Sequence, residues 1–164
     1  MWGKMIGAWG KMIGALVAGL TLTGCAPSAG TVLANGSHCG DVELGPDLTM
    51  RVLGYVSRWD HTQVFYVYAC ARKADRCRPV AFFFHALQPA FESLSDGTIN
   101  VDIFGGHLHR LHDGPMRVDG HRYVIHVREV GGSGPESAEA LNAAVDAFRK
   151  RSQIKGDCAP YALL

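Results

Sequence analysis

Between residues 48 and 128, stretches rich in β-branched and aromatic residues alternate with short segments that contain glycine, proline or aspartate. This succession restricts the fold more than any other feature, because such stretches have the composition and the two-residue period of β-strands. In the clearest case Ile99, Val101 and Ile103 are separated by polar residues, as expected of a strand with one buried face. Stretches of this kind are residues 48–56, 64–70, 79–85, 98–104, 107–111 and 122–128.

Only the last part of the chain has a helical period. Apolar residues recur there at helical intervals at Ala138, Leu141, Val145 and Phe148. The stretch from Ser133 to Glu136 has capping-box spacing, and the basic residues 149–151 suit the negative end of a helix dipole. Strands followed by one helix predict an α+β fold, in which an antiparallel sheet of about five to six strands packs against a C-terminal helix on one face.

Length and charge limit the classes of protein to which the chain can belong. Of its 164 residues, 48% are hydrophobic and 19% are charged, which is typical of a globular protein rather than a disordered or fibrous one. Residues 37–164 are sufficient for a single globular domain. The formal net charge is +1 and the basic residues are spread along the chain, so we expect no nucleic-acid binding.

The N-terminus has the pattern of an export signal. Lys4 and Lys11 precede an uncharged apolar run at residues 12–24. This run is too short to span a bilayer as a helix, which takes about 20 residues. Residues 2–8 are repeated as residues 9–15, and translation from either Met1 or Met5 would keep Lys11 and the apolar run.

The end of this run, Leu22-Thr23-Gly24-Cys25, resembles the lipobox of bacterial lipoprotein signal peptides. The resemblance implies that residues 1–24 are removed as a signal peptide and that Cys25 is lipidated. Residues 25–36 would then be a lipidated tether, and the protein would be held on the lipid bilayer of the cell envelope. Ala26 follows the cysteine, which in this resemblance favours the outer membrane, facing the periplasm, over the inner membrane. An ordinary secretory signal and a buried N-terminal helix are the alternatives.

The remaining cysteines predict two disulfides in an oxidising compartment. These residues are Cys39, Cys70, Cys77 and Cys158. Three pairings are available, and we favour Cys70–Cys77 across a polar loop, which leaves Cys39–Cys158 to join the start of the domain to its tail. A four-cysteine metal site is the alternative, but the chain contains no Cys-x-x-Cys motif.

Histidines suggest a second kind of site. His107 and His109 would point to the same side of one strand, and His121 or His126 could lie on a facing strand. Neutral imidazoles on one face are ligands for Zn²⁺ or Cu²⁺. The other interpretation is that these histidines are solvated or structural residues, as on many edge strands.

Aromatic residues suggest an interface, whereas no motif indicates catalysis. Tyr66 and Tyr68 face the same way on one predicted strand, and among the strand aromatics this is the pair that we expect to be exposed to a partner. The other interpretation is that these aromatic residues belong to the core. Gly131 and Ser133 begin a nucleophile-elbow pattern, but Pro135 occupies the place of its last glycine. The sequence therefore predicts a non-catalytic envelope lipoprotein that binds another envelope protein or a wall component. The alternative is a periplasmic metal-binding module that uses His107 and His109.

Overall fold

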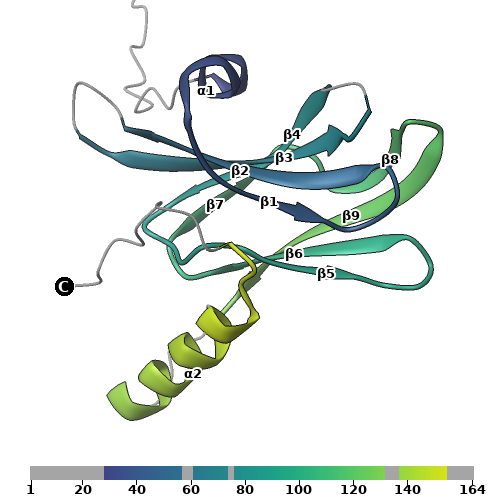
Figure 1. Cartoon of the computed structure of the whole chain (residues 1–164). Coiled ribbons are helices and arrows are strands. Elements are labelled where there is room, and N and C mark those ends of the chain that lie inside the picture. The colour runs from purple at the N-terminus through teal and green to yellow at the C-terminus, as the bar shows by residue number, and fades with distance from the viewer. Residues whose placement is uncertain (1–27, 57–60, 74–75, 132–136, 155–164) are drawn as a thin grey trace, which may run out of the picture.

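The computed structural model describes residues 28–56, 61–73, 76–131 and 137–154 of the chain (Figure 1). Within these ranges the chain forms nine strands and two helices. The strands make two stacked sheets, which we call sheet A and sheet B. Sheet A has the strand order β1-β2-β3-β4-β7, and sheet B has the order β5-β6-β9-β8.

The bounds of the elements are as follows. Sheet A contains β1 (Ser37–Glu43), β2 (Leu48–Val56), β3 (Gln63–Ala71), β4 (Cys77–Phe84) and β7 (His107–Arg110). Sheet B contains β5 (Ala90–Ser93), β6 (Thr98–Phe104), β8 (Gly114–Val118) and β9 (His121–Val130). The helices are α1 (Ala29–Asn35) and α2 (Ala138–Arg151). Neighbouring strands are antiparallel except β6 and β9, which are parallel.

The predicted α+β class, with mostly antiparallel strands and a C-terminal helix, is confirmed. The strands are more numerous than predicted and form two sheets instead of one. Three strands were missed, β1, β5 and β8, because each is short or rich in polar residues and glycine.

The core lies between the two sheets. Side chains of alternate residues from both sheets meet there, for example Phe65 and Phe83 of sheet A and Ile99, Val101 and Ile125 of sheet B. The rings of Phe65 and Phe83 stack with centroids 5.3 Å apart. Because strand side chains alternate, the residues between these positions point to the outer face of each sheet.

Gly105 and Gly106 carry the chain from sheet B to sheet A. A Gly-Gly pair between two strands is a common hairpin signal, but β6 and β7 are not a hairpin, because β6 lies in sheet B and β7 pairs with β4 in sheet A. Both glycines have positive φ, 69° and 70°. A Cβ at Gly106 would overlap the carbonyl oxygen of Phe84, so the crossing depends on glycine at this position.

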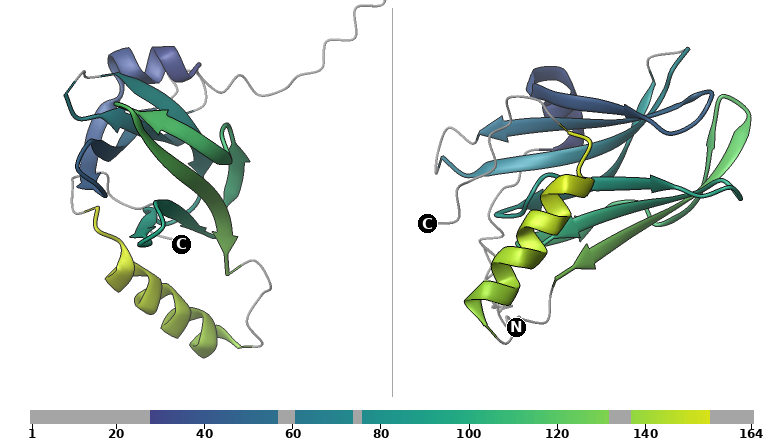
Figure 2. Two further views of the ribbon diagram at one scale, coloured as in Figure 1. Left: turned by 90° about the vertical axis from the view of Figure 1, so that its right-hand side faces the viewer. Right: turned by 60° about the horizontal axis from the view of Figure 1, so that its bottom comes forward.

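The two helices lie on opposite sides of the sandwich (Figure 2). Helix α1 packs on the outer face of sheet A, where Val32 is fully buried. It occupies part of the segment that the sequence suggested is a tether. The helix forms because Ser28 caps it, accepting a hydrogen bond from the Thr31 N–H, and because Val32 is covered by the sheet.

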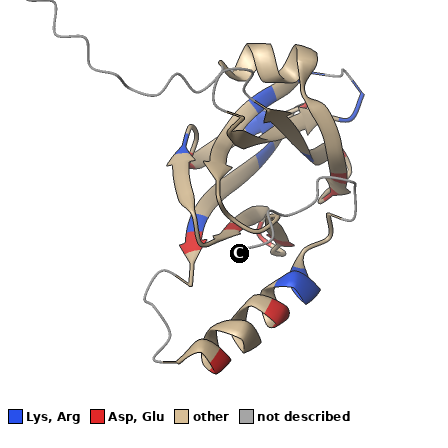
Figure 3. Ribbon diagram, turned by 90° about the vertical axis from the view of Figure 1, so that its left-hand side faces the viewer, with Lys and Arg blue, Asp and Glu red and all other residues tan. Residues whose placement is uncertain are grey.

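Helix α2 packs against sheet B through its second half. Val145 and Phe148 are buried there, whereas Leu141 and Ala138 are exposed. Its N-cap is Ser137, and the suggested cap Ser133 lies outside the described residues. The first turn carries an acidic residue and the last turn three basic ones, which suits the helix dipole (Figure 3).

Candidate functional site

The outer face of sheet A carries a row of stacked rings that crosses three strands. Its members are Tyr68, Tyr66, Phe82, His109, Phe84 and His107, which we call the aromatic row. Strand register brings them together, because Tyr66 pairs with Phe82 and Phe82 pairs with His109. The closest rings are those of Phe82 and His109, whose centroids lie 4.4 Å apart at an interplanar angle of 10°. The row is thus continuous from β3 to the edge strand β7.

Helix α1 covers one end of the aromatic row. Tyr66 and Tyr68 are only 3% and 0% exposed, and the Tyr68 hydroxyl donates a hydrogen bond of 2.7 Å to the carbonyl oxygen of Ala29. Burial raises the pKa of Tyr68 well above its ordinary value, and neighbouring Tyr66 adds to this shift. The two tyrosines face the same way, as predicted, but they are buried rather than exposed. The sequence did not reveal the helix that covers them.

The other end of the aromatic row is open. Phe82 and Phe84 are partly buried, and His107 and His109 are exposed at the edge of the sheet. Their side chains lie beside the part of sheet A that α1 covers, so the open rings and the helix form one continuous surface. On α1 itself, Leu33 is 40% exposed. A ring surface of this kind, partly apolar and partly polar, suits contact with a partner or with a membrane interface.

The four candidate metal ligands do not come together. They are His107 and His109 on β7 of sheet A, and His121 and His126 on β9 of sheet B. The prediction that His121 or His126 lies on a strand facing His107 and His109 is wrong, because β7 pairs with β4 and not with β8 or β9. Within the ranges that the structure describes, no group of three or more His, Cys, Asp or Glu residues could hold a metal ion.

The histidines of sheet B have acidic partners instead. Nδ1 of His121 lies 2.7 Å from Oδ2 of Asp47, which is buried in the loop between β1 and β2. Nδ1 of His126 lies 3.1 Å from Oδ1 of Asp113. These contacts connect loops to strand β9, so they explain both histidines without a metal ion.

The disulfide Cys70–Cys77 joins β3 to β4 as predicted. The two residues face each other in the register of these strands. Cys39 is buried on β1, but its predicted partner Cys158 lies outside the described residues, so the second pairing stays a prediction. Cys25 also lies outside them.

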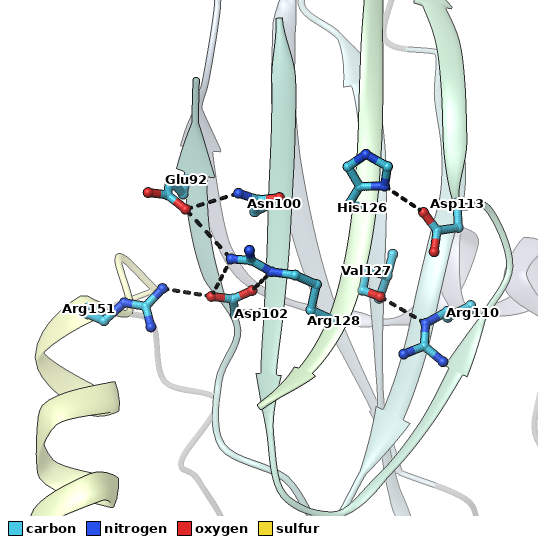
Figure 4. A network of polar contacts seen from close by, with 9 residues as sticks. All are labelled: Glu92, Asn100, Asp102, Arg110, Asp113, His126, Val127, Arg128 and Arg151. Atoms are coloured by element: carbon cyan, nitrogen blue, oxygen red, sulfur yellow. Dashed lines mark hydrogen bonds and ion pairs between the residues drawn. The ribbon is translucent and has the colours of Figure 1, made fainter. Parts of the chain in front are cut away.

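A charged network that the sequence did not predict occupies the outer face of sheet B (Figure 4). At its centre Asp102 of β6 is 1% exposed. Its carboxylate accepts hydrogen bonds of 2.7 and 3.0 Å from Nε and Nη2 of Arg128, and one of 2.7 Å from Nη2 of Arg151. The hydrogen bonds to Asp102 raise the pKa of Arg128, so its guanidinium group stays charged.

This network joins three elements. Arg128 lies on β9, and Arg151 is the last residue of α2, so the carboxylate ties the helix to the sheet. Glu92 on β5 extends the network, accepting a hydrogen bond of 3.0 Å from Asn100 and lying 3.6 Å from Arg128. Because each charged group at the centre has a partner, the arrangement is that of a structural network rather than of a reactive centre.

Comparison of the chain with protein-family models finds no match, and comparisons with curated proteins and with solved structures find none either. Among the described residues, no helix is long and apolar enough to cross a bilayer.

Proposed function

We propose that the protein is a bacterial envelope lipoprotein, anchored through Cys25, with a non-catalytic binding role at the membrane surface. The outer face of sheet A, with α1 and the open end of the aromatic row, is turned toward the bilayer in this proposal. The sequence favours the outer membrane, on its periplasmic side, as the bilayer that holds this anchor. The partner is another envelope protein or a wall component.

The observation that carries the proposal is the short distance in sequence between Cys25 and a packed helix. Only residues 26–28 separate Cys25 from the first residue of α1, Ala29. Three extended residues span about 10 Å, so a lipid on Cys25 would hold α1 close to the headgroups. The helix is itself fixed on sheet A by the burial of Val32 and by the hydrogen bond from Tyr68 to Ala29.

The composition of this face supports the same orientation. Leu33 is exposed on α1, and Phe82 and Phe84 are partly exposed on the outer face of sheet A. Rings and aliphatic groups at such a position gain from contact with the boundary between headgroups and acyl chains. The outer face of sheet B, in contrast, carries the charged network around Asp102 and suits water.

The anchor is tested by the intact mass of protein extracted from membranes, beside a Cys25→Ala variant. We expect a mass that corresponds to a chain starting at Cys25 plus acyl groups, and no such mass in the variant. An unmodified chain that keeps residues 1–24 would overturn the proposal.

The orientation is tested by chemical modification of histidines with diethyl pyrocarbonate. We expect His107 and His109 to be protected in the membrane-bound protein and to react after release into detergent. His126, which is exposed on the opposite sheet, is the internal control and should react equally in both states. Equal reactivity of His109 and His126 on membranes would contradict the orientation, even if Cys25 is lipidated.

A further inference from the structure

A small pocket opens at the end of the sandwich where the two sheets diverge. Its volume is about 250 Å³. The end of β3 and the start of β4 form one side, and β8 with the turn that follows it forms the other. The small side chains Ala69 and Ala71 leave this space open, since larger residues there would fill the gap between the sheets.

The pocket is lined by three arginines and one carboxylate. Arg76 and Arg78 come from sheet A and its adjoining loop, and Arg117 comes from β8 of sheet B. Asp119 is the acidic residue, and its Oδ1 lies 3.9 Å from Nη2 of Arg76, at the limit of an ion pair. The side chains of Arg78 and Arg117 form no hydrogen bond or ion pair with any part of the chain that the structure describes. Three guanidinium groups thus face one carboxylate, whose Oδ2 is buried without a hydrogen-bond partner, and the pocket carries an excess of positive charge.

The backbone that carries these arginines is fixed from both sides. Ala69 and Ala71 flank Cys70, and Arg76 and Arg78 flank Cys77, so the disulfide joins the two strand ends that form this wall, on the outer face of sheet A and away from the pocket. On the opposite side, positive φ values at Asp119 and Gly120, 45° and 90°, form the tight turn between β8 and β9. Both walls are thus held in place before any ligand arrives, which lowers the entropic cost of binding.

We propose that this arginine pocket binds a carboxylate or phosphate group of an anionic ligand. Guanidinium groups match the planar, two-oxygen geometry of such anions and bind them more strongly than neutral donors do. A pocket of this size accommodates one anionic group with a few attached atoms, so the remainder of the ligand would lie over the strand edges. The inference depends only on described residues and holds whether or not Cys25 is lipidated.

The test is an NMR titration of the arginine Nε–Hε signals with inorganic phosphate and, separately, with acetate, at constant ionic strength. We expect saturable shifts confined to Arg76, Arg78 and Arg117. Tighter binding of phosphate at equal charge would assign a phosphorylated ligand, and tighter binding of acetate a carboxylated one. Absence of saturation with both anions would overturn the proposal.

A double variant, Arg78→Gln with Arg117→Gln, distinguishes anion binding in this pocket from a general effect of the protein's net charge. Because the variant loses charge-assisted hydrogen bonds to the anion, we expect binding at least ten-fold weaker. The matched control is Arg149→Gln with Lys150→Gln on the exposed side of α2, which removes the same charge and should leave binding unchanged. Equal weakening in both variants would mean that the anions respond only to net charge. An unchanged thermal midpoint shows that each variant is folded.

The disulfide supplies a further readout. Selective reduction of Cys70–Cys77 frees the strand ends that carry Arg76 and Arg78, and we expect it to weaken anion binding several-fold while the sandwich stays folded. Anion binding that is unaffected by reduction would contradict the role of the disulfide in holding the pocket.

Discussion

The outer faces of the two sheets differ in what covers them. The outer face of sheet A carries stacked rings and one small ion-paired group, in which Nε of Arg51 lies 3.0 Å from Oδ1 of Asp41, and α1 covers part of this face through apolar contacts. The outer face of sheet B is built of charged and amide groups, and α2 is tied to it by Arg151 as well as by Phe148. The inner faces of the two sheets share one core, in which apolar side chains at alternate positions of the strands of both sheets are buried. What an outer face carries therefore decides which kind of contact holds its helix.

This contrast has a consequence for how each helix is held. When an apolar contact such as that of Val32 is broken, the stability lost is proportional to the apolar area that becomes exposed to water. A buried carboxylate such as Asp102 behaves differently, because removing it leaves two cations without their partner. We therefore expect the sheet B contact to respond more strongly to a single substitution than the sheet A contact.

The largest effect is expected for Asp102→Ala. Breaking a fully buried ion pair costs about 3–5 kcal/mol. The side chains of Arg128 and Arg151 are 45% and 52% exposed, so water can partly replace the carboxylate and we expect a loss of about 2–3 kcal/mol. Urea denaturation measures it. Asp146→Ala on the exposed side of α2 is the control and should change stability by less than about 0.5 kcal/mol. A similarly small loss of stability in both variants would contradict the stronger response expected of the contact between α2 and sheet B.

A smaller effect is expected for Val32→Ala. Deleting two buried methyl groups costs roughly 1–2 kcal/mol, and the loss falls on a helix of seven residues that has little stability by itself. We expect faster hydrogen exchange of the α1 amides and of β3 amides beneath them, with little change in sheet B. Leu33→Ala, at the exposed neighbouring position, is the matched control and should leave this exchange almost unchanged. Faster exchange throughout both sheets would mean that α1 is part of the global folding unit.

The third substitution, Tyr68→Phe, removes a single hydrogen bond from the same contact. The hydroxyl donates to Ala29, and its loss should cost about 1 kcal/mol. Because burial raises the pKa of Tyr68 in the folded state, the tyrosine contributes stability that is present below its unfolded pKa of 10.0 and is lost as pH rises above it. The variant should therefore be less sensitive to alkaline unfolding, followed by circular dichroism between neutral and strongly alkaline pH. Tyr55→Phe on the adjacent strand is the control, and equal alkaline sensitivity of the two variants would contradict the assignment.

The strands with strong patterns were predicted well. The stretches 48–56 and 98–104 coincide with β2 and β6, because apolar residues recur at alternate positions along most of each stretch. Helix α1 was missed because its seven residues are small or polar apart from Val32 and Leu33, and its stability comes from a sheet that is distant in sequence. Pairing between strands was equally hidden, since the choice of β4 as the neighbour of β7 depends on contacts across the whole domain.

The candidate site was predicted only where neighbours in sequence decide it. The Cys70–Cys77 disulfide follows from a short loop between two strands. The shared direction of Tyr66 and Tyr68 follows from the two-residue alternation of side chains along one strand. The environment of Asp102 was not predictable, because its partner Arg151 is 49 residues away on another element. The sequence showed only a polar residue in an alternating strand.

The smallest effect is expected for added metal ions. His107 and His109 lie on the same side of β7, as predicted, but each stacks on a phenylalanine ring, and a stable Zn²⁺ site needs three or four protein ligands. We expect Zn²⁺ or Cu²⁺ in slight excess to leave the thermal midpoint nearly unchanged, and calorimetry to detect no stoichiometric binding by these two residues. The double variant His107→Ala with His109→Ala is the comparison, and His126→Ala on sheet B is its control. Stoichiometric binding that disappears only in the double variant would favour the metal-binding module over a ring surface that faces the membrane.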